Sequence, residues 1–126
     1  MAQQKVFARQ AVLIVEDEPL LRLMAIDVVE DAGFDAVEAC DADEAIRILE
    51  SRRDITIVFT DIDMPGSMDG LLLAAAVRDR WPPIQIIVTS GYARFRDPVL
   101  PPGAVFFRKP YDIDKVTEQL RAMASH

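Results

Sequence analysis

Residues 55–61 read ITIVFTD, and residues 62–70 continue as IDMPGSMDG. An uninterrupted run rich in Ile, Val and Thr is typical of a strand buried on both faces of a sheet. The Pro65-Gly66 pair predicts a turn shortly behind it. The stretch therefore predicts a strand over Ile55–Thr60 that delivers Asp61 to the loop at its carboxyl end.

Further segments with the composition of strands, the second of them short and partly polar, lie on both sides of this strand. They predict four more strands, over Ala11–Val15, Phe34–Ala39, Ile84–Thr89 and Ala104–Phe107. Helical spacing of apolar residues predicts four helices, from Pro19 to Gly33, from Asp41 or Asp43 to about Arg52, over Leu71–Arg80 and over Ile113–Ala124. Strands that alternate with helices indicate an α/β fold, a doubly wound five-stranded parallel sheet.

Two segments carry expectations of their own. The first helix has an apolar stripe that we expect to face inward, formed by Leu20, Leu21, Met24, Val28 and Val29. The fourth helix of a regular alternation would lie over residues 93–102, which read ARFRDPVLPP. Because proline inside a helix costs about 3 kcal/mol or more, we expect a shortened or irregular helix there.

The bulk properties suit one domain. The 126 residues divide into a tail over 1–10 and a folded domain over 11–126, and the start does not resemble a secretion signal. A net charge of −7 argues against direct binding to nucleic acid or an anionic membrane. With one cysteine, no internal disulfide is possible, and no apolar run is long enough to span a membrane. We expect a cytoplasmic protein without membrane insertion.

Polar residues follow the strands at their carboxyl ends, where doubly wound sheets bind ligands. Glu16-Asp17-Glu18 follows the first strand, and Asp61 and Asp63 follow the third. Converging carboxylates repel one another unless a cation compensates, and Mg²⁺ prefers oxygen ligands. We expect Asp17 and Asp61 to bind Mg²⁺ directly, Glu16 directly or through water, and Asp63 through its backbone carbonyl.

A metal-bound aspartate can act as a nucleophile on phosphorus, and phosphoryl transfer needs positive charge around the phosphoryl oxygens. Lys109, after the fifth strand, would supply part of that charge. Ser90, after the fourth, would donate a hydrogen bond to a phosphoryl oxygen. The predicted chemistry is phosphorylation of Asp61.

Four motifs in chain order resemble the receiver domains of two-component response regulators, over about Val12 to Ala124. They are VLIVEDE, TDIDMPGSMDG, IIVTSGY and VFFRKPYD. The resemblance implies a flavodoxin-like (βα)5 fold. It implies that Asp61 is the phosphoacceptor, that Ser90 is the switch hydroxyl with Thr89 as the alternative, and that Phe106 is the switch aromatic residue. It also implies a cis peptide bond between Lys109 and Pro110.

The resemblance further implies a phosphohistidine donor on a sensor histidine kinase or a histidine phosphotransfer protein, and an unknown downstream protein partner. We expect no output domain within these 126 residues. We expect no enzymatic turnover beyond self-phosphorylation from a donor and slow autodephosphorylation.

Two other functions stay open from the sequence. Asp61-Ile-Asp63 also resembles the nucleophile motif of haloacid-dehalogenase-type phosphatases, although that motif usually ends the first strand. The chain could also be a receiver-shaped binding module that is never phosphorylated. Turnover of a phosphomonoester would indicate the first, and no response to any phosphoryl donor would indicate the second.

Overall fold

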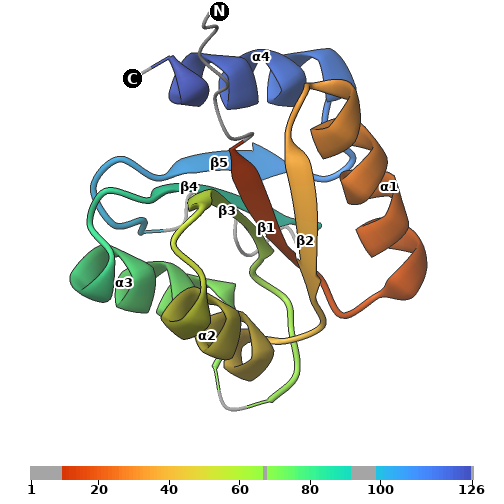
Figure 1. Ribbon diagram of the computed structural model, residues 1–126. Helices are drawn as coiled ribbons and strands as arrows, with labels where there is room; N and C mark the ends of the chain where they lie inside the picture. Colours follow the sequence, from red (N-terminus) through yellow and green to blue (C-terminus); the bar gives the residue numbers. More distant parts are fainter. Residues whose placement is uncertain (1–9, 67, 92–98, 126) are drawn as a thin grey trace, which may run out of the picture.

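The computed structural model describes residues 10–66, 68–91 and 99–125 (Figure 1). The strands are β1 (Ala11–Val15), β2 (Asp35–Ala39), β3 (Ile55–Asp61), β4 (Gln85–Ser90) and β5 (Val105–Arg108). The helices are α1 (Pro19–Asp31), α2 (Ala42–Ser51), α3 (Gly70–Arg80) and α4 (Ile113–Ala124). Each predicted strand is present, with its ends within one residue of the prediction.

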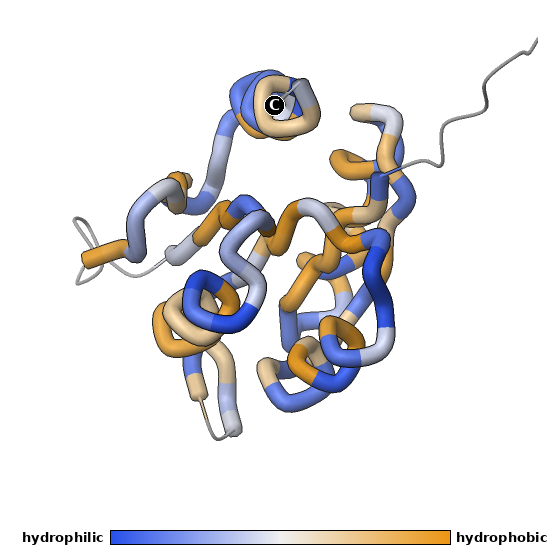
Figure 2. The backbone as a smooth tube through the Cα atoms, turned by 60° about the vertical axis from the view of Figure 1, so that its left-hand side comes forward, coloured by the Kyte–Doolittle hydropathy of each residue, from blue (hydrophilic) through white to orange (hydrophobic). Residues whose placement is uncertain are grey.

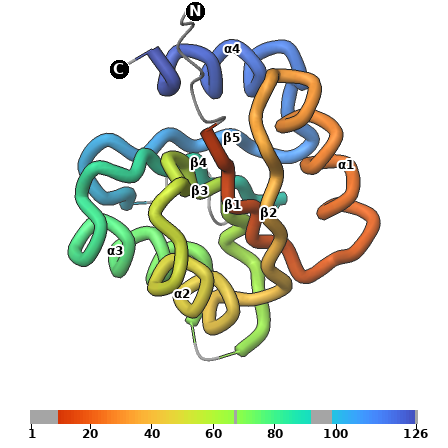
Figure 3. Tube along the Cα trace, viewed as in Figure 1, coloured from red at the N-terminus to blue at the C-terminus, as the bar shows by residue number. Residues whose placement is uncertain are grey.

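The five strands form one parallel sheet in the order β2-β1-β3-β4-β5. The chain runs from β1 outward to β2, returns through α2 to β3, and then continues to β4 and β5 on the other side (Figure 3). The direction of winding therefore reverses between β1 and β3. The predicted doubly wound sheet is confirmed, and its switch point lies where β1 and β3 end.

Two helix layers cover the sheet, α1 and α4 on one face and α2 and α3 on the other (Figure 1). Each layer buries its own cluster of apolar side chains against the strands. Figure 2 shows hydrophobic and hydrophilic residues alternating along the turns of the helices, as expected for helices that bury one face. No helix in the described part of the chain has the length and apolar character that crossing a membrane requires.

The expectation that the apolar stripe of α1 faces inward holds only in the second half of the helix. Val28 and Val29 are buried, but Leu20, Leu21 and Met24 are 63%, 37% and 49% exposed. The second half of α1 packs on the sheet and contacts α4, whereas Leu21 and Met24 border a cavity in place of packed core. Amphipathic spacing marks one face of a helix, but it does not show how far along the helix its neighbours extend.

The connection between β4 and β5 contains no helix at residue 91 or over 99–104, the described part of this segment. The expected irregular helix over residues 93–102 falls mostly on residues 92–98, which lie outside the described residues. Most of the expected tail, residues 1–9, also lies outside them. Gln10 is described, and its side chain donates a hydrogen bond of 3.4 Å to the carbonyl oxygen of Ala124.

Candidate functional site

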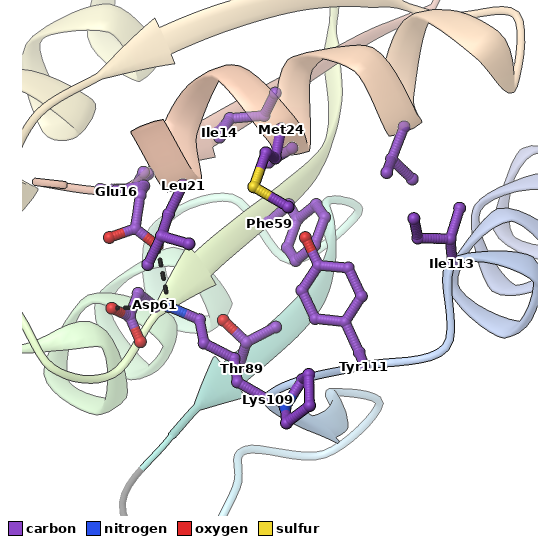
Figure 4. A pocket seen from close by; sticks show the side chains of 14 residues that line it. Ile14, Glu16, Leu21, Met24, Phe59, Asp61, Thr89, Lys109, Tyr111 and Ile113 are labelled. Atoms are coloured by element: carbon purple, nitrogen blue, oxygen red, sulfur yellow. Dashed lines mark hydrogen bonds and ion pairs between the residues drawn. The ribbon is translucent and has the colours of Figure 1, made fainter. Parts of the chain in front are cut away.

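Three strand ends bring charged side chains together at the switch point. Glu16 follows β1, Asp61 ends β3 and Lys109 follows β5. The ammonium nitrogen Nζ of Lys109 lies 2.9 Å from Oε1 of Glu16 and 3.2 Å from Oδ2 of Asp61 (Figure 4). Residues 93 positions apart in the chain thus meet because their strands are parallel members of one sheet.

Asp61 is nearly enclosed, with 5% of its surface exposed. Burial raises the pKa of Asp61 to about 6, because a carboxylate loses hydration there; the charge of Lys109 opposes this rise and the charge of Glu16 adds to it. Its Oδ1 atom is buried and has no hydrogen-bond partner among the described residues. A buried carboxylate oxygen without a donor is costly unless a cation or donor reaches it.

Lys109 is held from two sides. Its burial would lower its pKa, but the hydrogen bond to Glu16 and the charges of Asp61 and Glu16 outweigh this effect and raise the pKa above the ordinary value. Its backbone N–H donates to the carbonyl oxygen of Ser90 at 2.9 Å. The Lys109–Pro110 peptide bond is cis, which is the isomer that the resemblance implies. Lys109 is therefore a charged, oriented cation beside Asp61.

The carboxylates fit a divalent cation. One oxygen each from Glu16, Asp17 and Asp61 lie within 4.8 Å of one another. Asp17 is exposed, while Glu16 and Asp61 are buried, so the cluster opens to solvent on one side. Carboxylate oxygens are the ligands that Mg²⁺ prefers, and the unpartnered Oδ1 of Asp61 needs a positive neighbour. This cluster could hold a metal ion.

The two candidate hydroxyls at the end of β4 differ in position. Thr89 pairs with Asp61 across the sheet and lines a cavity on the side of α1 and α4. Ser90 is fully buried, and its Oγ donates to Oδ2 of Asp63 at 2.8 Å. Side chains alternate along a strand, so Ser90 shares the face of Val88, where α3 packs.

Phe106 lies on that same face. It pairs with Val88 across the sheet, is half-buried, and packs with the cluster beneath α2 and α3. Phe107 packs on the opposite face, beneath α1 and α4. Ser90 and Phe106 are therefore on one side of the sheet, whereas Thr89 is not. This arrangement favours Ser90 over Thr89 as the hydroxyl that is coupled to Phe106.

Sequence reasoning missed Gly70, the first residue of α3. A side-chain carbon at Gly70 would overlap the backbone carbonyl oxygen of Asp61. The backbone N–H of Gly70 donates to the carbonyl oxygen of Ile62 at 3.0 Å, so α3 starts directly against the end of β3. In the sequence, Gly70 is the last residue of the motif TDIDMPGSMDG, nine residues after Asp61, but its contact with the end of β3 is visible only in the fold.

Comparison with known proteins gives one consistent result. The family model "Response regulator receiver domain" matches residues 12–121. The chain is 33% identical over 109 residues to the nitrogen assimilation regulatory protein NtrX of Azorhizobium caulinodans, covering 83% of this chain and 24% of that protein. It is 33% identical over 118 residues to the sensor kinase CckA of Brucella abortus, covering 89% of this chain and 12% of that protein.

A solved structure of a response regulator has a fold similar to that of this chain. The response regulator TrrA of Thermotoga maritima, in complex with Mg²⁺ and BeF, has a TM-score of 0.81 at 25% identity. The match covers 90% of this chain and 98% of that one. The chain spans about a quarter of the length of NtrX and 12% of the length of CckA.

Proposed function

The chain belongs to the response regulator receiver domain family, and from this premise we propose that it is a phosphoacceptor switch of a two-component or phosphorelay system. One observation carries the proposal. Lys109 Nζ lies within 2.9 Å of Glu16 and 3.2 Å of Asp61, at the edge where a doubly wound sheet binds ligands. An enclosed carboxylate, a second carboxylate and a fixed cation are the groups that aspartyl phosphorylation needs.

The donor is a phosphohistidine on a sensor histidine kinase or a histidine phosphotransfer protein. An oxygen of Asp61 attacks phosphorus, the P–N bond breaks, and its electron pair leaves with the imidazole. Lys109 offsets the charge that spreads over the phosphoryl oxygens, and Ser90 donates a hydrogen bond to one of them. The similarity to a nitrogen assimilation regulatory protein and to a sensor kinase supports a donor of this class.

Mg²⁺ is the proposed cofactor. Glu16, Asp17 and Asp61 would hold it, with the backbone carbonyl of Asp63 as a further ligand. When bound, it supplies positive charge to the carboxylates and the phosphoryl oxygens. The complex of the relative TrrA with Mg²⁺ and BeF supports this assignment.

The output is a change in partner binding, and no substrate is turned over. To reach a phosphoryl oxygen, the Ser90 hydroxyl leaves Asp63, its present acceptor. Phe106 packs on the same face of the sheet, and its ring moves toward the space that the Ser90 hydroxyl leaves. A local charge change thus alters the surface that a downstream protein reads. We propose a cytoplasmic location, where a donor of this kind would act.

The test is to incubate the protein with phosphoramidate and Mg²⁺ and to measure its intact mass. The expected result is one added phosphoryl group that requires Mg²⁺ and is absent in Asp61→Asn. A folded wild-type protein that gains no mass and also fails to bind beryllofluoride would contradict the proposal. Sustained hydrolysis of a phosphomonoester would instead favour a phosphatase.

A further inference from the structure

Arg22 contacts the loop that carries two of the three acidic residues of the site. Its Nη1 group donates a hydrogen bond of 2.9 Å to the backbone carbonyl oxygen of Glu16, and its Nε group donates one of 3.0 Å to Oε1 of Glu38. Glu38 belongs to β2, the edge strand, and α1 lies beside that strand (Figure 1). One guanidinium therefore connects the β1–α1 loop to α1 and β2, and the proposed phosphoryl transfer assigns no role to this contact.

The position of Arg22 is unfavourable for the helix that carries it. Arg22 is the fourth residue of α1, close to the end where the helix dipole is positive, and the first turn contains no acidic residue. The Arg22 side chain is 21% exposed, compared with 42% for Arg52 and 46% for Arg80, two other arginines that form ion pairs. A largely covered cation at this place needs compensating contacts, which Glu38 and the Glu16 carbonyl provide.

The bond from Arg22 adds to several contacts that hold Glu16. The backbone N–H of Glu16 donates to the carbonyl oxygen of Ala39 at 3.1 Å. The Glu16 carboxylate accepts from Lys109 at 2.9 Å and from the backbone N–H of Glu18 at 3.2 Å. Arg22 occupies the backbone carbonyl, so both the main chain and the side chain of Glu16 are fixed.

The same hydrogen bond also orients Asp17. A peptide group is planar, so the carbonyl oxygen of Glu16 and the α-carbon of Asp17 lie in one rigid plane. A donor that fixes this oxygen therefore restricts the point from which the Asp17 side chain starts. Asp17 is exposed, so packing does not hold its carboxylate toward Glu16 and Asp61. The convergence of the three carboxylates thus depends on the orientation of this peptide group.

We propose that Arg22, held by Glu38, is a positioning residue of the metal site, because it fixes the peptide group between Glu16 and Asp17. The inference rests on the proposed Mg²⁺ site. The Arg22–Glu38 pair has no net charge, so it gives the loop a hydrogen-bond donor without adding a net positive charge near a cation site. A guanidinium suits this task, since its N–H groups point in two directions, whereas lysine has one nitrogen.

The sign of one effect separates this role from a simple effect of charge. Arg22→Met removes a positive charge near the cluster, so electrostatics alone would strengthen cation binding. Loss of the positioning contact should instead weaken binding by about tenfold or more, as for other residues that orient metal ligands. Electron paramagnetic resonance measures binding as loss of the free Mn²⁺ signal, with Mg²⁺ as competitor. Equal or tighter binding in folded Arg22→Met would overturn the proposal.

Arg52→Met is the matched control. Arg52 pairs with Asp54 at 2.6 Å, and this pair precedes β3, whereas Asp61 ends that strand. The substitution removes the same charge and a similar ion pair at the opposite edge of the sheet. The metal affinity should stay within about twofold of wild type, because exposed charges at this separation are screened. An equal loss at Arg22 and Arg52 would overturn the proposal, since the effect would not come from the contact with Glu16.

Glu38 should act only through Arg22. Glu38→Ala should weaken metal binding about threefold in the wild-type protein and should have no further effect in Arg22→Met. An effect of the Glu38 charge itself would be the same in both backgrounds, so additive losses would overturn the claim that Glu38 holds Arg22.

Arg22→Lys keeps the proposal testable if Arg22→Met does not fold. Lysine retains the positive charge but cannot make both contacts, so we expect metal binding to weaken about threefold. Wild-type affinity in this variant would overturn the proposal.

The amide signal of Asp17 gives a readout without metal. This N–H belongs to the same peptide group as the Glu16 carbonyl, so loss of the hydrogen bond from Arg22 should shift its signal in a ¹H–¹⁵N NMR spectrum. Arg52→Met should leave the signal in place. An unchanged Asp17 signal in Arg22→Met would overturn the proposal.

The positioning role and the proposed function fail differently. Unchanged metal affinity in Arg22→Met, with phosphoramidate still labelling Asp61 of the wild-type protein, would overturn only the role of Arg22. No binding of Mn²⁺ or Mg²⁺ by the folded wild-type protein would overturn the metal site and this inference together.

Discussion

The hydroxyl of Ser90 donates a hydrogen bond of 2.8 Å to Oδ2 of Asp63, two residues beyond the proposed phosphoacceptor. Ser90 is fully buried, so its hydroxyl cannot exchange this acceptor for water. A phosphoryl group on Asp61 would have to compete with the Asp63 carboxylate for the same proton. Asp63 therefore holds the proposed switch hydroxyl in its unphosphorylated position.

Replacing Asp63 with alanine should ease activation. Hydrogen bonds to charged groups contribute about 1.5–3 kcal/mol, so removal of this competitor should tighten binding of beryllofluoride by about tenfold or more. Calorimetric titration with Mg²⁺ present measures the affinity. In a double-mutant cycle, Ser90→Ala should remove most of the gain, since the gain depends on the Ser90 hydroxyl. Additive effects of the two substitutions would show that Asp63 does not act through Ser90.

The metal-free protein should lose stability as pH rises toward 6. The pKa of Asp61 is raised to about 6 by burial, so the folded state binds a proton that the unfolded chain releases near pH 4. The free energy of unfolding therefore falls as pH rises between these values, by at most about 3 kcal/mol. Above the folded-state pKa of about 6 it falls no further from this cause.

Urea denaturation in a metal chelator from pH 4 to pH 7 measures this effect. Asp61→Asn should lack this pH-dependent component and should be more stable than wild type at pH 7, because it removes a buried charge. Parallel pH profiles for the two proteins would show that the carboxyl of Asp61 titrates normally.

Asp17→Asn should weaken Mg²⁺ binding with little effect on folding. Its carboxylate is exposed but lies in the acidic cluster with Glu16 and Asp61. A unit charge near a divalent ion contributes several kcal/mol, so we expect a loss of at least about tenfold in affinity. Thermal unfolding measures it, since Mg²⁺ at 100 times its dissociation constant stabilises the fold by about 2.7 kcal/mol. Glu18→Gln is the matched control, because Glu18 is exposed nearby but outside the cluster.

Gly70→Ala should displace the end of β3, which carries Asp61. The added carbon would overlap the backbone carbonyl oxygen of Asp61, which cannot move without shifting the end of β3. We expect a loss of about 3 kcal/mol in the free energy of unfolding, together with slower phosphorylation. At Gly91 an added carbon would lie 3.8 Å from Cβ of Lys109, an ordinary contact. Gly91→Ala should therefore cost less than about 1 kcal/mol, and equal losses at both positions would contradict this view of Gly70.

Several features were predictable because they depend on local sequence. Apolar segments identified all five strands, although Asp35 and Glu38 interrupt the second, and the acids directly after the first and third identified Glu16 and Asp61 as candidates. The parallel arrangement followed from the alternation of strands and helices, since short right-handed crossovers leave few other topologies. The inward stripe of α1 was predicted wrongly at Leu20, Leu21 and Met24, because periodicity does not indicate what lies opposite a helix.

The amino-acid sequence by itself determined the order of the elements and the residue types at the carboxyl ends of the strands, because both are set by contacts within a few residues. Only the tertiary structure decided which of these residues meet. It brought Lys109 between Glu16 and Asp61, placed Ser90 rather than Thr89 on the face of Phe106, and left an apolar cavity beside Asp61. These relationships depend on sheet register and on how far each helix covers the sheet, which are set by packing between distant segments.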